Sequence, residues 1–203
     1  MREEAETVSV YTEIQLDALR ELANVGSGTA GIALSGLVCR PIDISVPVAL
    51  ALPLAEAVDA LGDAADRVTG VALPVAGDLD AAALLLFGDE EVAVLCGLLG
   101  VAPATELGQS ALAEVGNVVC ASYVGALSAM TCMTHEPGPP VVATERVGTL
   151  LASAMAPGRD GSSVALVLDT NLRVEGERCD FTFVLLPTAA GVGELLMRLG
   201  VGS

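Results

Sequence analysis

An internal repeat is the feature that most constrains the fold of this chain. Residues of the first half recur in the second half with an offset of 93 positions, the separation of Glu21 and Glu114. The matching residues are Ala18, Leu19, Glu21, Asn24 and Val25 with Ala111, Leu112, Glu114, Asn117 and Val118, Ala33-Leu34-Ser35 with Ala126-Leu127-Ser128, and Pro47 with Pro140. A chain with this repeat is expected to fold as two copies of one arrangement.

Hydrophobic periodicity predicts the elements of the first copy. Apolar residues spaced by three, four and seven positions predict a long helix over residues 13–38, and Arg40-Pro41 is expected to end it. Alternating apolar residues predict a strand over 42–52, and Pro47 inside it indicates a sheet edge or a bulge. A short helix, two strands joined at Gly77-Asp78, and a helix capped by Asp89 are predicted over residues 54–61, 67–75, 81–87 and 89–99.

The pattern starts again after Pro103. A second long helix is predicted over residues 106–132, and the proline-rich segment 136–140 is interpreted as its sharp exit. A strand, a short helix, a strand, a hairpin and a final helix follow. We therefore expect a single domain over residues 1–203, with repeats at about 13–102 and 106–200. The predicted fold is α+β: an internally duplicated, pseudo-twofold antiparallel sheet with both long helices on one face.

Composition excludes several kinds of partner and site. The chain has 26 acidic residues against nine basic ones and a net charge of −17, so a nucleic-acid partner is not expected. This acidity is typical of adaptation to a salty cytosol, where salt screens repulsion between carboxylates. Five cysteines without a close pair indicate a reducing compartment. With His135 as the single histidine, no metal or cofactor is expected on this chain. His135 itself is interpreted as a surface residue at the C-terminal end of the second long helix.

The sequence also favours a cytoplasmic protein. Residues 1–6 are acidic and lack the apolar core of a secretory signal. Residues 115–134 carry no charge and are long enough to span a membrane, but they are rich in Gly, Ser, Thr and Asn. A buried helix is therefore favoured over a membrane span.

Two polar trios carry the chemistry. Asp17, Glu21 and Asn24 stand at positions i, i+4 and i+7 of a predicted helix, which places them on one face. Ser110, Glu114 and Asn117 repeat this spacing. One such trio alone would be interpreted as a solvated helix face, whereas two at the same offset favour a functional site.

A proline follows each asparagine after 23 residues, as Pro47 and Pro140. This pattern resembles the signature of the CheC, CheX and FliY phosphatases, in which Asp or Ser, Glu, Asn and Pro are separated by three, two and 22 residues. The contexts Glu-Leu-Ala-Asn-Val-Gly-Ser-Gly and Glu-Val-Gly-Asn-Val-Val are also similar to that family. The resemblance covers about residues 13–200. Two motifs without an extra domain are the arrangement of its CheC-like members.

The resemblance implies a chemotaxis phosphatase that hydrolyses the aspartyl phosphate of the response regulator CheY. In that role, Asn24 and Asn117 would orient the attacking water, and Glu21 and Glu114 would dock against the regulator's lysine. Mg²⁺ would be bound by the regulator. Because one chain supplies two sites, a monomer is expected.

Three other interpretations of the sequence are possible. By the same resemblance, the chain could be mainly an adaptor or decoy that binds the receptor deamidase CheD. A structural role at the flagellar switch is disfavoured, because no FliN-like tail follows Gly200. The glycines of Gly26-x-Gly28-x-x-Gly31 match a dinucleotide-binding string, but a helix precedes them instead of a strand. Close approach of helices or sheet is the favoured interpretation of these glycines.

Overall fold

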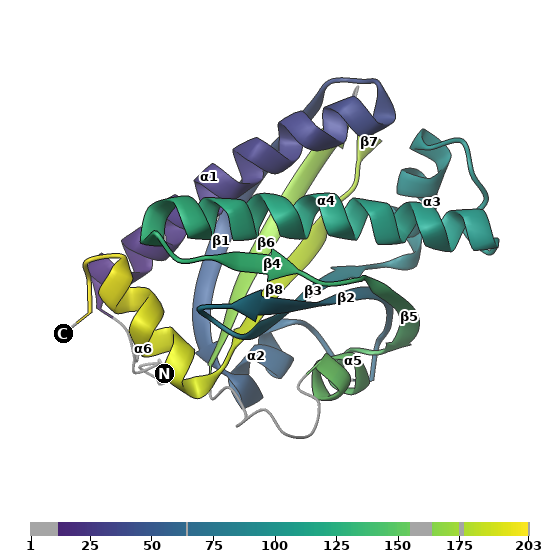
Figure 1. Cartoon of the computed structure of the whole chain (residues 1–203). Helices are drawn as coiled ribbons and strands as arrows, with labels where there is room; N and C mark the ends of the chain where they lie inside the picture. Colours follow the sequence, from purple (N-terminus) through teal and green to yellow (C-terminus); the bar gives the residue numbers. More distant parts are fainter. Residues whose placement is uncertain (1–11, 64, 155–163, 175–176, 203) are drawn as a thin grey trace, which may run out of the picture.

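The computed structural model of the chain describes residues 12–63, 65–154, 164–174 and 177–202. Helices and strands alternate along it in an order that repeats in the second half (Figure 1). They are α1 (Glu13–Val38), β1 (Ile42–Pro53), α2 (Leu54–Ala60), β2 (Arg67–Gly77), β3 (Ala81–Phe87), α3 (Asp89–Leu98), α4 (Glu106–Thr131), β4 (His135–Pro137), β5 (Val141–Arg146), α5 (Val147–Ala154), β6 (Val164–Val174), β7 (Glu177–Arg178), β8 (Phe181–Pro187) and α6 (Ala189–Arg198).

A single antiparallel sheet of eight strands organises the molecule. Its strand order is β1-β6-β8-β3-β2-β4, and β5 and β7 pair with β2 and β6 respectively. Every described strand pair is antiparallel. The predicted α+β class with an antiparallel sheet is thus confirmed.

The outer strand registers support the predicted duplication. Strand β1 pairs with β6, and in the other half β4 and β5 pair with β2. Ile44 lies opposite Leu172, and Pro137 lies opposite Val75. Ile44 and Pro137 are 93 residues apart, whereas their partners Val75 and Leu172 are 97 residues apart. The ladder of β1 shifts between Ser45 and Val48, and the corresponding residues 138–140 separate β4 from β5. Strands β3 and β8 pair at the centre. The pseudo-twofold relation itself stays a prediction.

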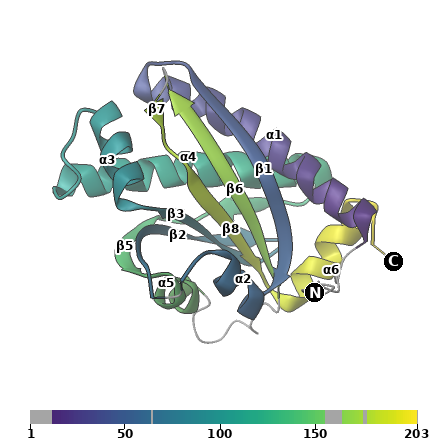
Figure 2. The same ribbon diagram turned by 180° about the vertical axis from the view of Figure 1, so that it is seen from behind.

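Side chains from both faces of the sheet are buried. Helices α1 and α4 cover one face (Figure 1), and α2 and α5 lie against the other (Figure 2). Successive residues of β3 point alternately to the two cores, for example Leu85 to the α1/α4 side and Leu84 to the α2/α5 side. Burial on both faces explains why β3 is continuously apolar.

Two local predictions were wrong. Helix α3 has Gly88 as its N-cap, without a side-chain hydrogen bond, so Asp89 is the first helical residue and not the cap. The segment 136–140 is not simply a helix exit, because Glu136 and Pro137 belong to β4 and pair with β2. That pairing depends on a partner strand 60 residues earlier in the chain, which local turn signals do not contain.

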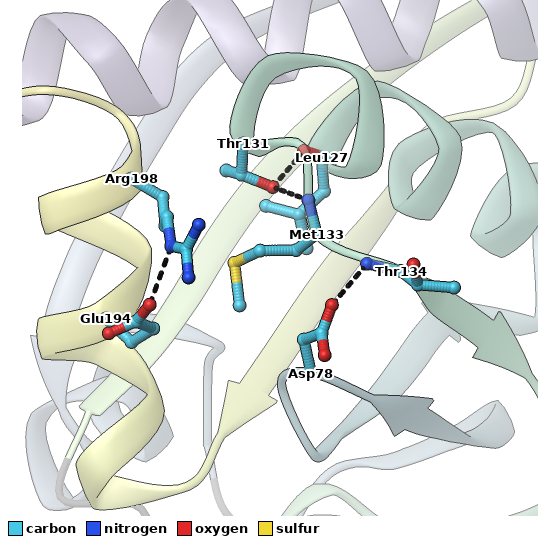
Figure 3. Close-up of polar contacts among 7 residues, drawn as sticks. All are labelled: Asp78, Leu127, Thr131, Met133, Thr134, Glu194 and Arg198. Carbon is cyan, nitrogen blue, oxygen red and sulfur yellow. Dashed lines mark hydrogen bonds and ion pairs between the residues drawn. The ribbon is translucent and has the colours of Figure 1, made fainter.

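The end of α4 is held by polar contacts (Figure 3). Thr131 Oγ1 donates to the carbonyl of Leu127 at 2.7 Å and accepts from the Met133 amide at 3.3 Å. Asp78, in the β2–β3 hairpin, accepts from the Thr134 amide at 2.7 Å. The first two bonds close the end of the helix, and the third ties the chain after it to the β2–β3 hairpin.

Helix α4 is long and apolar enough to cross a membrane by length and composition. However, 56% of its most apolar window is buried inside the molecule. Val115, Val119 and Leu127 of this helix belong to the main hydrophobic core. The packing of α4 is that of a core helix.

Candidate functional site

The first polar trio lies on the outer face of α1. A capping box starts this helix: the Gln15 amide donates to Thr12 Oγ1, and the Gln15 side chain accepts from the Thr12 amide. Asp17, Glu21 and Asn24 are all exposed. The opposite face of α1 is buried against the sheet and α4 through residues that include Leu19, Leu22 and Ala23.

The second trio occupies the same positions on α4. Thr105 caps this helix by accepting from the Gly108 amide at 3.1 Å. Ser110 and Glu114 are exposed, and Asn117 is half-buried. The two predicted faces therefore both exist, and the second asparagine is the less accessible one.

The four Glu and Asn side chains have no hydrogen-bond or ion-pair partner within the described part of the chain: they are Glu21, Asn24, Glu114 and Asn117. By contrast, Asp17 forms an ion pair with Arg20 at 2.6 Å. Each face thus presents an unpaired carboxylate and, three residues on, a carboxamide that can both donate and accept.

The two motif prolines lie in the edge segments that follow the long helices, Pro47 within β1 and Pro140 outside any strand. Pro47 falls within the register shift of β1, as the prediction of an edge or bulge required. Pro140 falls between β4 and β5. Both interrupt the ladder, because proline has no amide hydrogen to donate.

His135 is not the surface residue at a helix end that its sequence context suggested. It lies in β4, where Nδ1 is 3.1 Å from Ser128 Oγ, and its Nε2 is buried without a partner. Burial lowers the pKa of His135, and the charge of Asp78 partly opposes this shift. Among the described residues, no cluster of three or more His, Cys, Asp or Glu side chains could hold a metal ion.

The glycine string is helical throughout, since Gly26, Gly28 and Gly31 all belong to α1. A Cβ on Gly26 would lie 2.4 Å from the Tyr123 ring of α4. This glycine therefore permits close helix packing, as predicted. A Cβ on Gly28 would have no neighbour within 4 Å, so the packing interpretation is wrong for Gly28.

Two exposed apolar residues next to the trios were missed by sequence reasoning. Ile14 on α1 is 69% exposed and Leu107 on α4 is 70% exposed. They are related by the same offset of 93 as the Glu and Asn residues. The repeat could have identified these two residues as a matched pair. Apolar periodicity alone does not distinguish them from the other residues of the two predicted helices.

Comparison with known proteins identifies a relative. No protein-family model matches the chain. However, it is 28% identical over 201 residues to the CheY-P phosphatase CheC of Bacillus subtilis strain 168, covering 93% of this chain and 95% of that protein. The chain is therefore similar to CheC over nearly its whole length.

Solved structures show the same fold. FliY from Thermotoga maritima is similar with a TM-score of 0.75 at 21% identity, over 96% of this chain and 100% of that one. The FliM middle domain from H. pylori has a TM-score of 0.68 at 8% identity, over 93% and 99%. CheX from Desulfovibrio desulfuricans has a TM-score of 0.52 at 15% identity, over 82% and 99%. The chain therefore has the fold shared by these proteins.

Proposed function

We propose that the chain is a phosphatase that hydrolyses the aspartyl phosphate of the chemotaxis response regulator CheY. The observation that carries this proposal is the pair of Glu/Asn faces on α1 and α4, unpartnered within the described part of a chain that is similar to CheC. We further propose that the protein acts in the cytoplasm as a monomer, since one chain carries two faces.

The proposed chemistry requires little of this chain beyond orientation. The regulator supplies the phosphoryl group, a bound Mg²⁺ and a lysine, so that its partner has only to place a water in line with the scissile bond. The carboxamide oxygen of Asn24 or Asn117 accepts a hydrogen bond from that water, and the amide group can donate to a phosphoryl oxygen. Asparagine is too weak a base to remove the proton, so its contribution is positional.

The glutamates have a docking role in this proposal. Glu21 and Glu114 are unpaired and exposed, so each is available to bind the regulator's lysine through a charge-assisted hydrogen bond. Because Asn24 and Asn117 follow three residues later on the same helix face, that bond fixes the register of the carboxamide over the phosphoryl group.

The test is the decay of phosphorylated CheY from the same organism, in Mg²⁺ and high salt, with and without this protein. We expect acceleration by the wild type and its loss in Asn24→Ala/Asn117→Ala. Loss of an orienting amide costs on the order of 10² to 10³ in rate, by analogy with single donors in oxyanion holes. Each single variant should keep the activity of the other face.

The matched control is Asn171→Ala, which removes the same carboxamide from β6, away from both helices. It should accelerate decay as the wild type does. Acceleration by the double variant would contradict the role of the asparagines. If the wild type is inactive but binds CheD, the adaptor alternative is favoured instead.

A further inference from the structure

Resting on the proposed phosphatase function, we propose that the regulator's docking footprint extends beyond the Glu/Asn pairs along each helix. An apolar anchor, Ile14 or Leu107, forms one end of the footprint. A small residue, Gly28 or Ala121, forms the other end and allows the partner to approach closely.

The spacing places these residues on one face. Ile14, Glu21 and Gly28 are separated by seven residues each, and Leu107, Glu114 and Ala121 repeat this pattern. Seven residues are nearly two helical turns, so each series lies along one stripe of about 21 Å. Asn24 and Asn117 stand between the glutamate and the small residue.

The anchors are exposed without contributing to the fold. Ile14 and Leu107 are 69% and 70% exposed, whereas the buried faces of α1 and α4 hold the core. A single exposed apolar residue needs no explanation. The same position in both halves, two turns before an unpaired glutamate, indicates a shared surface.

Gly28 provides an independent observation. Glycine within a helix lowers helix stability relative to alanine, and no neighbour lies within 4 Å of a Cβ at this position. Nothing inside the described structure therefore requires glycine there. Ala121, at the equivalent position, is also exposed and is the next smallest residue. A partner that approaches the helix beside the asparagine explains the small size at both positions.

The occupant is the activated regulator because the stripe is continuous with the proposed reacting groups. The two central glutamates are exposed and unpaired, so the docked surface has to supply a cation between an apolar patch and a close backbone contact. In most interfaces a few residues provide most of the binding free energy. An apolar anchor beside a charge-assisted hydrogen bond is such a small set. A second copy of this chain would place like charges together, since its net charge is −17.

The first test measures binding, not turnover, so that it is independent of the phosphatase assay. The dissociation constant of CheY activated with beryllofluoride and Mg²⁺ is measured for the wild type and for Ile14→Ser/Leu107→Ser. We expect at least a tenfold increase in the dissociation constant, because each anchor loses its apolar contact area. The matched control is Val141→Ser, which alters a 62% exposed residue in strand β5.

The second test separates docking from folding. Gly28→Leu/Ala121→Leu adds bulk where the partner would approach but improves helix propensity at the glycine. We expect a raised melting temperature together with a dissociation constant increased at least tenfold. A variant that is more stable but binds less well cannot be explained by misfolding.

Equal dissociation constants for wild type and both variants would overturn the footprint, even if the wild type accelerates dephosphorylation. Failure of the wild type to bind activated CheY would also overturn it. Sedimentation gives a further outcome: a dimer that dissociates on Ile14→Ser/Leu107→Ser would assign the stripe to self-association instead. If the wild type binds activated CheY but does not accelerate its dephosphorylation, the phosphatase proposal is contradicted and the docking footprint is not.

Discussion

Gly26 and Gly28 are two residues apart on α1 but have opposite steric surroundings. A Cβ on Gly26 would lie 2.4 Å from the Tyr123 ring, whereas one on Gly28 would meet nothing within 4 Å. We expect Gly26→Ala to lower the free energy of unfolding by about 1–3 kcal/mol through overpacking. Gly28→Ala should raise it by about 0.5–1 kcal/mol through helix propensity.

Urea denaturation of the two variants tests this contrast directly, since each change adds one methyl group to the same helix. The linear dependence of unfolding free energy on urea gives both values on one scale. Equal effects of the two substitutions would mean that Tyr123 moves away from position 26 without cost.

His135 predicts a pH dependence of stability. Burial lowers its pKa in the folded chain below the ordinary value of 6.5, with Asp78 partly opposing the shift. At a pH between the lowered pKa of the folded chain and the ordinary pKa of the unfolded chain, His135 binds a proton in the unfolded chain but not in the folded chain. Stability should therefore be complete above about pH 6.5 and fall as the pH drops through this window. Thermal unfolding of the wild type and His135→Gln between pH 5.5 and 7.5 tests this.

Because the chain has one histidine, the substitution should flatten the stability curve in that window. A curve of the same slope in His135→Gln would assign the dependence to carboxyl groups. Sequence reasoning did not anticipate this behaviour, because it placed His135 on the surface. Its burial results from packing between β4 and the Ser128 region of α4, which residue order does not specify.

Capping decides where the two long helices begin. Thr12 and Thr105 each accept a hydrogen bond from the amide three residues later, at 3.4 Å and 3.1 Å. We expect Thr105→Ala to lower the free energy of unfolding by about 1 kcal/mol, because the Gly108 amide loses its acceptor. Thr29→Ala makes the same chemical change inside α1, where Thr29 donates to the Val25 carbonyl.

At Thr29 the exchange should be neutral or slightly stabilising, because alanine is the better helix former. Chemical denaturation of both variants provides the measurement. A Thr105→Ala protein as stable as the Thr29→Ala protein would show that water replaces the cap without cost.

At the element scale, most boundaries follow from local signals. Helix α1 begins and ends where apolar spacing and the Arg40-Pro41 stop place it, and β3 matches its predicted range. The errors occur where tertiary contacts decide. Strand β4 forms because Val75, Ala76 and Gly77 supply a partner edge, and α3 starts after Gly88, which caps it without a side-chain hydrogen bond. Local composition contains neither fact.

At the scale of the molecule, the repeat predicted the architecture. It predicted both long helices on one face of an antiparallel sheet, and it placed the Glu and Asn residues on two exposed stripes. It did not predict their unequal exposure. Asn117 is half-buried because α4 lies deeper than α1, with Val115, Val119 and Tyr123 in the core. How deeply each long helix is buried depends on the packing of the two halves against each other, which the repeated sequence does not specify.

Charge is the remaining property of the whole molecule that predicts behaviour. The net charge is −17, and the described ion pairs join Arg20, Arg178 and Arg198 to acids two to four residues away on exposed surface. Such local, exposed pairs add little stability. Most carboxylates therefore repel one another more strongly in the compact state than in the expanded unfolded chain.

Salt should consequently stabilise the fold. The screening length shortens from about 10 Å at 0.1 M to about 3 Å at 1 M salt, so the melting temperature should rise steadily over this range. NaCl and KCl should give the same curve, because screening does not depend on the identity of the cation. A rise with one cation alone would indicate a specific binding site, and a flat curve would show that the carboxylates are too far apart to destabilise the folded chain.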